Sequence, residues 1–181
     1  MRKLMIFAAC GILAATTHAA AVGWSLATGS TTYGSKAYQF FVIGQNGATS
    51  IETITALLDE GKSTDSYAFG SGQTGSTGGA TVTPASSGKT LDAGTYESFF
   101  ILFDSTTPTS GSSQYVVVSG AANLTKTIAA TTANASFASG NASSIVNNAD
   151  NWKSYGPVPE PTSGLLLLLG MAGLALKRKR A

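Results

Sequence analysis

The expected architecture depends on one run of residues, Tyr96-Glu97-Ser98-Phe99-Phe100-Ile101-Leu102-Phe103. Side chains alternate between two faces in an extended chain, so Phe99, Ile101 and Phe103 point one way while the residues between them point the other. Both faces of this strand are therefore apolar. Because each face has to be covered, we expect the strand at the centre of a sheet that is buried on both sides.

Further strands are expected before and after this run. Residues 37–43 (Ala-Tyr-Gln-Phe-Phe-Val-Ile) are the second clear strand. Residues 115–118 follow the central strand after a loop rich in serine, threonine and glycine, which predicts an antiparallel hairpin with a long connection. Weaker strand patterns cover residues 22–27, 80–83 and 123–128.

One helix is expected between the strands. Thr49 and Glu52 have the spacing of a capping box, with Thr49 as the N-cap. Ile54 and Leu58 then fall on one face of the helix, and Gly61 supplies a C-terminal stop. We expect this apolar face to cover one side of the sheet.

Together these elements predict a mostly β domain with one covering helix over residues 21–137. We expect a small antiparallel β-sandwich or a jelly-roll-like arrangement. Residues 70–79 (Gly-Ser-Gly-Gln-Thr-Gly-Ser-Thr-Gly-Gly) have the composition of a flexible loop. Residues 138–158, rich in asparagine, serine and alanine, are expected to form a spacer, with one more strand or helix as the alternative.

The N-terminus has the three parts of a secretory signal peptide, which we place at residues 1–20. A basic pair at residues 2–3 is followed by an uncharged apolar run over residues 4–15 and then by small residues. The apolar run is shorter than the ~20 residues that a membrane span needs. A signal peptidase that requires small side chains at positions −3 and −1 can cut after Ala19 or after Ala21.

The C-terminus carries a second apolar segment. Residues 163–176 hold no charge and include five consecutive leucines, and we expect them to form a transmembrane helix. The segment is short for a bilayer, but snorkelling basic side chains and local thinning compensate for the mismatch. A buried core helix is the alternative, although the segment lacks a polar face. Four cations follow the segment and should stay in the cytoplasm, with the body of the protein outside: Lys177, Arg178, Lys179 and Arg180.

The tail at residues 159–181 resembles the PEP-CTERM sorting signal of exported bacterial proteins. The Pro-Glu-Pro signature falls on Pro159, Glu160 and Pro161, ahead of the leucine-rich span and the basic stop. The resemblance implies that an integral-membrane exosortase recognises and cuts the tail, which releases the body or re-attaches it at the cell surface. Many proteins with this signal are associated with exopolysaccharide production or the extracellular matrix. The prolines keep the peptide extended and accessible to a protease in the membrane.

Composition excludes several function classes for the body. Residues 21–160 contain five basic and nine acidic side chains, a net charge of −4, and a nucleic-acid partner would need a basic face instead. The single cysteine and the single histidine, Cys10 and His18, both lie within the expected signal peptide. Catalytic triads, cysteine nucleophiles and zinc sites with the usual ligands are therefore not available to the exported body. We expect no catalytic residues, no metal and no cofactor.

The leading hypothesis is a non-enzymatic protein of the cell surface or extracellular matrix that is anchored in the inner membrane before its tail is processed. Its partners would be signal peptidase, exosortase, the membrane and, through the resemblance, exopolysaccharide. A carbohydrate-binding module is the alternative, and it would need aromatic side chains on one exposed sheet face, drawn from Trp24, Tyr33, Tyr38, Tyr67 and Tyr96. A hydrolase with paired carboxylates is the third, drawn from Asp59, Glu60, Asp65, Asp92, Glu97 and Asp104.

Overall fold

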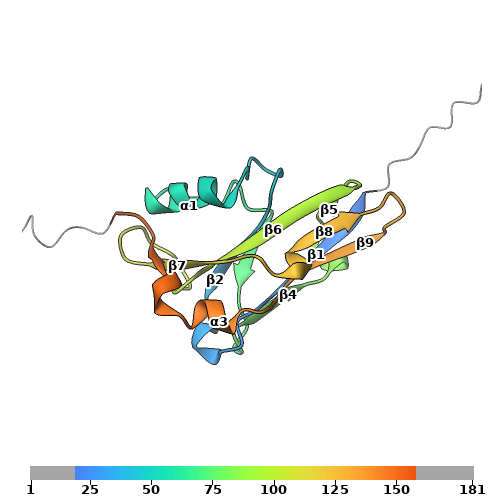
Figure 1. Cartoon of the computed structure of the whole chain (residues 1–181). Helices are drawn as coiled ribbons and strands as arrows, with labels where there is room; N and C mark the ends of the chain where they lie inside the picture. Colours follow the sequence, from blue (N-terminus) through green and yellow to red (C-terminus); the bar gives the residue numbers. More distant parts are fainter. Residues whose placement is uncertain (1–18, 158–181) are drawn as a thin grey trace, which may run out of the picture.

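The computed structural model describes residues 19–157 of the chain. These residues form two β-sheets with three α-helices beside them (Figure 1). The first sheet consists of β1 (Ala20–Ala27), β4 (Gly79–Val82), β5 (Thr90–Leu91) and β9 (Asn134–Asn141). The second consists of β2 (Ala37–Val42), β3 (Gly70–Gln73), β6 (Gly94–Phe103), β7 (Gln114–Val118), β8 (Thr125–Ile128) and β10 (Lys153–Ser154). The helices are α1 (Ile51–Asp59), α2 (Pro84–Ser87) and α3 (Ser143–Val146). A mostly β fold is thus confirmed.

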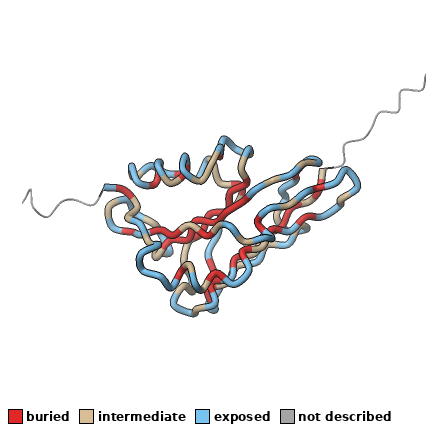
Figure 2. The backbone as a smooth tube through the Cα atoms, viewed as in Figure 1, coloured by how far each residue is buried: buried red, intermediate tan, exposed pale blue. Residues whose placement is uncertain are grey.

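The two sheets enclose the larger of two apolar cores, which we call the inter-sheet core. Trp24 and Phe137 enter it from the first sheet, and Phe40 and Phe100 enter it from the second. The Trp24 and Phe40 rings stack with their centroids 5.2 Å apart. Buried backbone follows the central strands, while the loops are exposed (Figure 2).

A second core, the helix-side core, lies between the other face of the second sheet and α1. Phe41 and Phe99 contribute stacked rings from neighbouring strands, with centroids 4.9 Å apart. Ile54 and Leu58 contribute the buried face of α1. Burial of side chains of this size stabilises the docked helix by about 1.5–3 kcal/mol each.

Strand β6 lies at the centre of the second sheet, as its sequence predicts. Phe99, Ile101 and Phe103 belong to the helix-side core, whereas Phe100 and Leu102 belong to the inter-sheet core. β6 pairs with β2 along one edge and with β7 and β8, at successive positions, along the other. All three pairings are antiparallel. The β6–β7 ladder confirms the predicted hairpin with a long connection.

Helix α1 covers the sheet as expected, but its N-terminal cap differs from the prediction. The N-cap is Ser50, whose hydroxyl accepts a hydrogen bond from the Thr53 backbone N–H at 3.2 Å. The expected capping box with Thr49 as the N-cap is therefore wrong by one residue. The predicted stop is confirmed, since Gly61 follows the C-cap with a φ of +75° that favours glycine.

Three further expectations are corrected by the structure. Residues 70–73 form strand β3, which pairs with β2, so only part of the expected 70–79 loop is a loop. β1 and β9 pair in parallel, so the sandwich is not purely antiparallel. Residues 138–156, which belong to the expected spacer, are instead part of the folded domain, because Ala142 and Val146 are buried in the inter-sheet core.

The folded domain also begins earlier than expected. Ala20, which we assigned to the signal peptide, is the first residue of β1 and is fully buried. Residues 1–18 and 158–181 lie outside the described residues, and so do most of the signal peptide and the predicted transmembrane helix at 163–176. Within residues 19–157, no helix is both long and apolar enough to cross a bilayer.

Candidate functional site

The last described segment of the chain is bound tightly to the domain. β10 adds to the edge of β7, with Lys153 opposite Tyr115 and Ser154 opposite Gln114. After the strand, the Tyr155 N–H donates to the Ser113 carbonyl at 2.8 Å and the Tyr155 carbonyl accepts from the Gly111 N–H at 2.6 Å. The domain therefore holds the chain up to the point where the tail begins.

Gly156 is the last residue that is buried in this way. Its N–H donates to the Leu58 carbonyl at the end of α1, at 2.8 Å. Its φ is +84°, and a Cβ atom here would overlap the Ser110 hydroxyl and come within 3.1 Å of Gly61 Cα. Only glycine fits such a close backbone contact without strain. We call Gly61, Ser110, Gly111, Tyr155 and Gly156 the tail junction.

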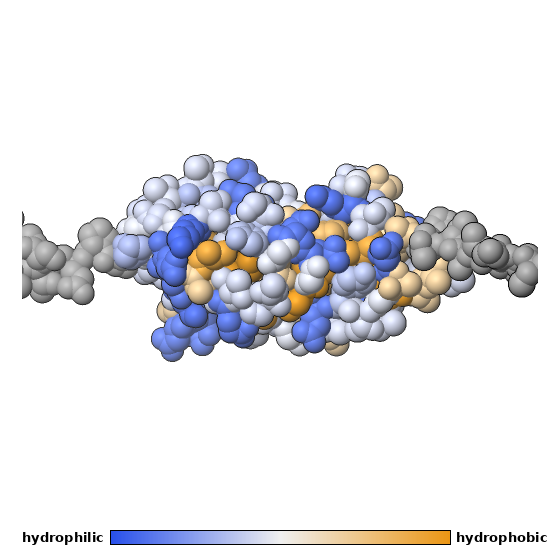
Figure 3. Space-filling model, turned by 90° about the horizontal axis from the view of Figure 1, so that it is seen from above, coloured by the Kyte–Doolittle hydropathy of each residue, from blue (hydrophilic) through white to orange (hydrophobic). Residues whose placement is uncertain are grey.

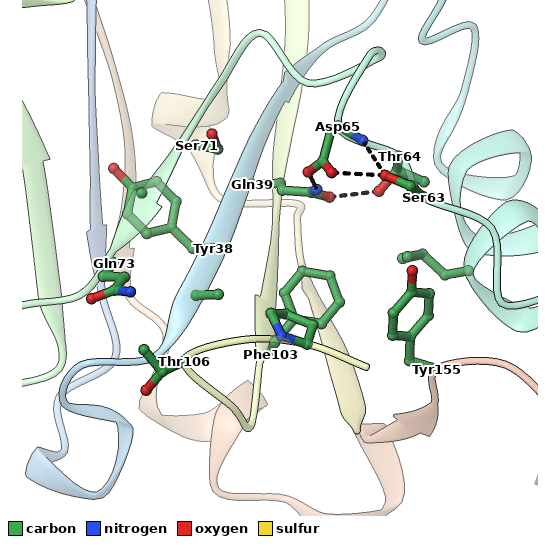
Figure 4. Close-up of a pocket in the computed structure, with 14 residues that line it drawn as sticks. Tyr38, Gln39, Ser63, Thr64, Asp65, Ser71, Gln73, Phe103, Thr106 and Tyr155 are labelled. Atoms are coloured by element: carbon green, nitrogen blue, oxygen red, sulfur yellow. Dashed lines mark hydrogen bonds between the residues drawn. The ribbon is translucent and has the colours of Figure 1, made fainter. Parts of the chain in front are cut away.

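A hollow of about 310 Å³ lies beside the tail junction (Figure 4). Its walls come from β2, β3, the loop after α1 and the loop that joins β6 to β7. Tyr155 supplies an aromatic side, and its ring meets that of Phe103 edge to face, with centroids 5.8 Å apart. Most of the remaining lining is polar, with hydroxyl, amide and carboxylate groups: Gln39, Ser63, Thr64, Asp65, Ser71, Gln73 and Thr106.

A hydrogen-bonded network organises one wall of the hollow. Gln39 is 6% exposed, and its amide Nε2 donates to Asp65 Oδ1 at 2.7 Å. Its Oε1 accepts from the buried Thr64 hydroxyl at 2.6 Å. Ser63 donates to the other oxygen of Asp65 at 2.7 Å. The network fixes the loop after α1 onto strand β2 and leaves the Asp65 carboxylate at the surface, able to accept further hydrogen bonds.

The surroundings of Tyr155 change the pKa of its hydroxyl. Burial, and to a lesser extent the nearby negative charge of Asp65, raise the pKa of Tyr155 above its ordinary value. Tyr155 therefore stays a neutral phenol at physiological pH and can both donate and accept a hydrogen bond. Every buried side-chain nitrogen and oxygen among residues 19–157 has a partner, so the hollow contains no orphaned buried side-chain group.

The aromatic side chains that carbohydrate binding would need do not form one exposed row, since two are buried and Tyr33, Tyr67 and Tyr96 are only partly exposed. Trp24 and Tyr38 are 4% and 3% exposed, and the Trp24 indole N–H donates to the Tyr38 hydroxyl at 3.2 Å. Tyr38 leaves β2 on the side opposite Gln39 (Figure 4). Tyr96 is half-buried against the inter-sheet core, and Tyr33 stacks on Trp152. The expected sugar-stacking face is therefore wrong in this form.

The candidate carboxylates do not line a common hollow. Asp65 is the one acidic residue that lines the hollow beside the tail junction, and Asp104 is the one that lines each of two other hollows on the described surface. Asp59 accepts a hydrogen bond from the Tyr115 hydroxyl at 2.6 Å. No group of three or more acidic, histidine or cysteine side chains suited to a metal ion occurs in residues 19–157.

The face that bears α1 has mixed polarity. Hydrophobic patches there are interrupted by hydrophilic side chains (Figure 3). Ile51, Leu57 and Val117 are partly exposed where they pack against the helix-side core. Such scattered partial exposure is ordinary for a small domain and does not by itself mark an interface.

Several residues of the hollow and the tail junction were not predicted from the sequence. Gln39 on β2 and the adjacent pair Tyr155 and Gly156 come together from two distant segments at the hollow and the tail junction. A sequence signal existed for Gln39 alone, as the one amide side chain within the apolar strand over residues 37–43. The signature Pro159, Glu160 and Pro161 and the basic stop Lys177 to Arg180 lie outside the described residues.

Comparison with known proteins concerns this same end of the chain. Residues 157–180 match the family model described as the PEP-CTERM protein-sorting motif. Searches of curated proteins and of solved structures found no match. The matched segment starts at Pro157, directly after the last residue of the tail junction. The chain thus carries a PEP-CTERM protein-sorting motif, as an exosortase substrate does, joined without a spacer to a two-sheet β domain.

Proposed function

We propose that this protein is exported, held in the inner membrane by its tail, and delivered by exosortase processing to the cell surface or extracellular matrix, where the β domain has a non-enzymatic role. The observation that carries the proposal is the match of residues 157–180 to the sorting motif. The signal peptide expected at residues 1–20 supports it, because it directs the body to the side of the membrane where the tail would be processed.

The attachment of the tail to the domain is consistent with this route. The stretch from Gly156 to Thr162, the last residue before the leucine-rich span, is seven residues long. Fully extended, it reaches at most about 25 Å. The tail junction and its hollow would therefore lie close to the membrane surface until the tail is cut.

The proposed non-enzymatic role has two supports. The residues after Ala19 contain no histidine and no cysteine. The three hollows described on the domain are each lined by one carboxylate, whereas paired-carboxylate hydrolysis requires two acids about 5–10 Å apart across a cleft.

Removal of the tail tests the proposal. Deletion of residues 163–181 should change the destination of the protein, because the proposed span and basic stop are lost. Localisation by fractionation of cells and medium, with intact-mass analysis of each fraction, would measure this. Unchanged surface localisation of the deleted form would refute the sorting role.

A pair of single substitutions makes the test specific. Glu160→Ala alters the Pro-Glu-Pro signature, while Asp150→Ala removes an exposed acid from the described domain, ten residues earlier in the chain. We expect Glu160→Ala to slow tail processing at least tenfold and Asp150→Ala to be processed like the natural protein. Equal processing of the two variants would contradict recognition of the signature.

Saccharide binding is a second candidate function, and the hollow beside the tail junction favours it. The Tyr155 ring, the Asp65 carboxylate and the Gln73 amide all line this hollow, which thus combines an apolar platform with hydroxyl-binding groups. A volume of about 310 Å³ accommodates a small polar ligand. The ligand would then be a saccharide of the exopolysaccharide outside the producing cell.

Retention on purified extracellular polysaccharide from the producing cells tests this candidate. Asp65→Ala and Tyr155→Ala should each reduce retention at least tenfold, because both side chains line the hollow. Asp92→Ala, which removes an exposed carboxylate between β5 and β6, serves as the matched control. Equal retention of Asp65→Ala and Asp92→Ala would eliminate the hollow as the binding site.

A further inference from the structure

The start of β1 distinguishes between the two positions at which the signal peptide can be cut. Ala20 is fully buried in the inter-sheet core and lies opposite Leu91 of β5. Ala21 lies opposite Thr90, and its N–H donates to the Ala133 carbonyl at 2.9 Å. These two residues make all of the β1–β5 pairing.

A cut after Ala21 would remove both residues from the mature protein. β5 would lose its partner strand, and Leu91, 3% exposed, would lose the packing of Ala20. The new terminal ammonium would be on Val22, which is fully buried and whose N–H donates to the Lys89 carbonyl at 2.9 Å.

A cut after Ala19 leaves β1 complete. The new ammonium would be on Ala20, which is as fully buried as Val22, so the two cuts differ in the β1–β5 pairing and not in the burial of the new terminus. The bond satisfies the requirement for small residues, with Ala19 at position −1 and Thr17 at position −3.

We propose that signal peptidase hydrolyses the Ala19–Ala20 bond and that the mature domain begins at Ala20. One water is consumed, and its atoms complete a carboxylate on Ala19 and an ammonium on Ala20. The inference rests on the export step of the proposed function. In the folded domain the start of β1 and the tail junction lie at opposite ends (Figure 1).

N-terminal sequencing of the full-length protein after expression in an exporting bacterial host tests the inference. We expect Ala20 as the first residue. A matched pair of variants separates the two bonds: Thr17→Arg changes position −3 of the proposed bond alone, and Ala21→Gln changes position −1 of the alternative alone. Thr17→Arg should lower the yield of the Ala20 terminus at least tenfold, and Ala21→Gln should leave that terminus in place.

The possible results separate this inference from the export proposal. A natural chain that begins at Val22, or an Ala21→Gln variant that is no longer cut, would overturn the Ala19–Ala20 assignment and leave export intact. A natural chain that remains uncut would overturn both.

Discussion

Tyr115 shows how one side chain connects the sheet to the covering helix. It extends from β7 into the helix-side core, and its hydroxyl donates to Asp59 Oδ1 on α1 at 2.6 Å. Burial raises the pKa of Tyr115, and the hydrogen bond to Asp59 and the charge of Asp59 raise it further. The phenol is thus strongly favoured over the phenolate in the folded protein.

This shift predicts a loss of stability in alkali. Since the pKa is higher in the folded protein than in the unfolded chain, the contribution of Tyr115 is fully present below about pH 10, the unfolded value. It is lost as the pH rises from there towards the raised folded pKa. Urea unfolding at pH 8 and pH 11 should show a smaller decrease for Tyr115→Phe than for the natural protein.

Two comparisons define the alkaline test. At pH 8, Tyr115→Phe should cost about 0.5–1.5 kcal/mol, since one hydrogen bond is lost. Tyr96→Phe serves as a control at a half-buried tyrosine packed against the other core. The same alkaline decrease in Tyr115→Phe and in the natural protein would show that Tyr115 is not the group responsible.

At the scale of elements, β6 organises the domain because its two faces enter different cores. Its neighbours β2 and β7 show the same division, with Phe40 in the inter-sheet core and Phe41 and Tyr115 in the helix-side core. The second sheet is therefore covered by the first sheet on one face and by α1 on the other. This arrangement positions α1 and its following loop to form a wall of the hollow.

The tail junction predicts an unequal response to two glycine substitutions. Gly156→Ala introduces a Cβ at a positive φ and against Ser110 and Gly61, and should cost about 2–5 kcal/mol. Gly44→Ala has a similar φ of +87° but nothing within 4 Å of the added Cβ, and should cost about 1–2 kcal/mol.

Denaturant unfolding of both glycine variants would measure the difference. The additional loss in Gly156→Ala should come from detachment of β10 and Tyr155, so amide exchange should accelerate at Gly111, Tyr155 and Gly156. Equal destabilisation by the two substitutions would mean that the close contact at the junction adds no stability.

At the scale of the whole molecule, the described chain enters at one end of the domain and leaves at the other (Figure 1). β1 starts beside β5, whereas Gly156 lies beside the end of α1. On the proposed route, a tail embedded in the membrane would turn the tail junction and hollow towards the bilayer and the start of β1 away from it. Processing of the tail would then expose the hollow.

Much of the domain follows from local pattern. An alternation of apolar side chains on both faces predicts the central place of β6, and a helical repeat of apolar residues predicts α1. The sorting motif could also be identified directly, because a linear motif read by a processing enzyme is defined by adjacent residues.

Strand β9 and the site required the folded arrangement. β9 (Asn-Ala-Ser-Phe-Ala-Ser-Gly-Asn) buries Ala135 and Phe137 but lacks β-branched residues, so its strand pattern is weak. Its partner β1 lies more than 100 residues earlier in the chain, and no local pattern encodes that pairing. Similarly, the segments at Gly61, Ser110 and Gly156 are far apart in the sequence and meet only in the folded domain. Local sequence specifies which face of an element is apolar, whereas the identity of distant neighbours depends on how all the elements pack together.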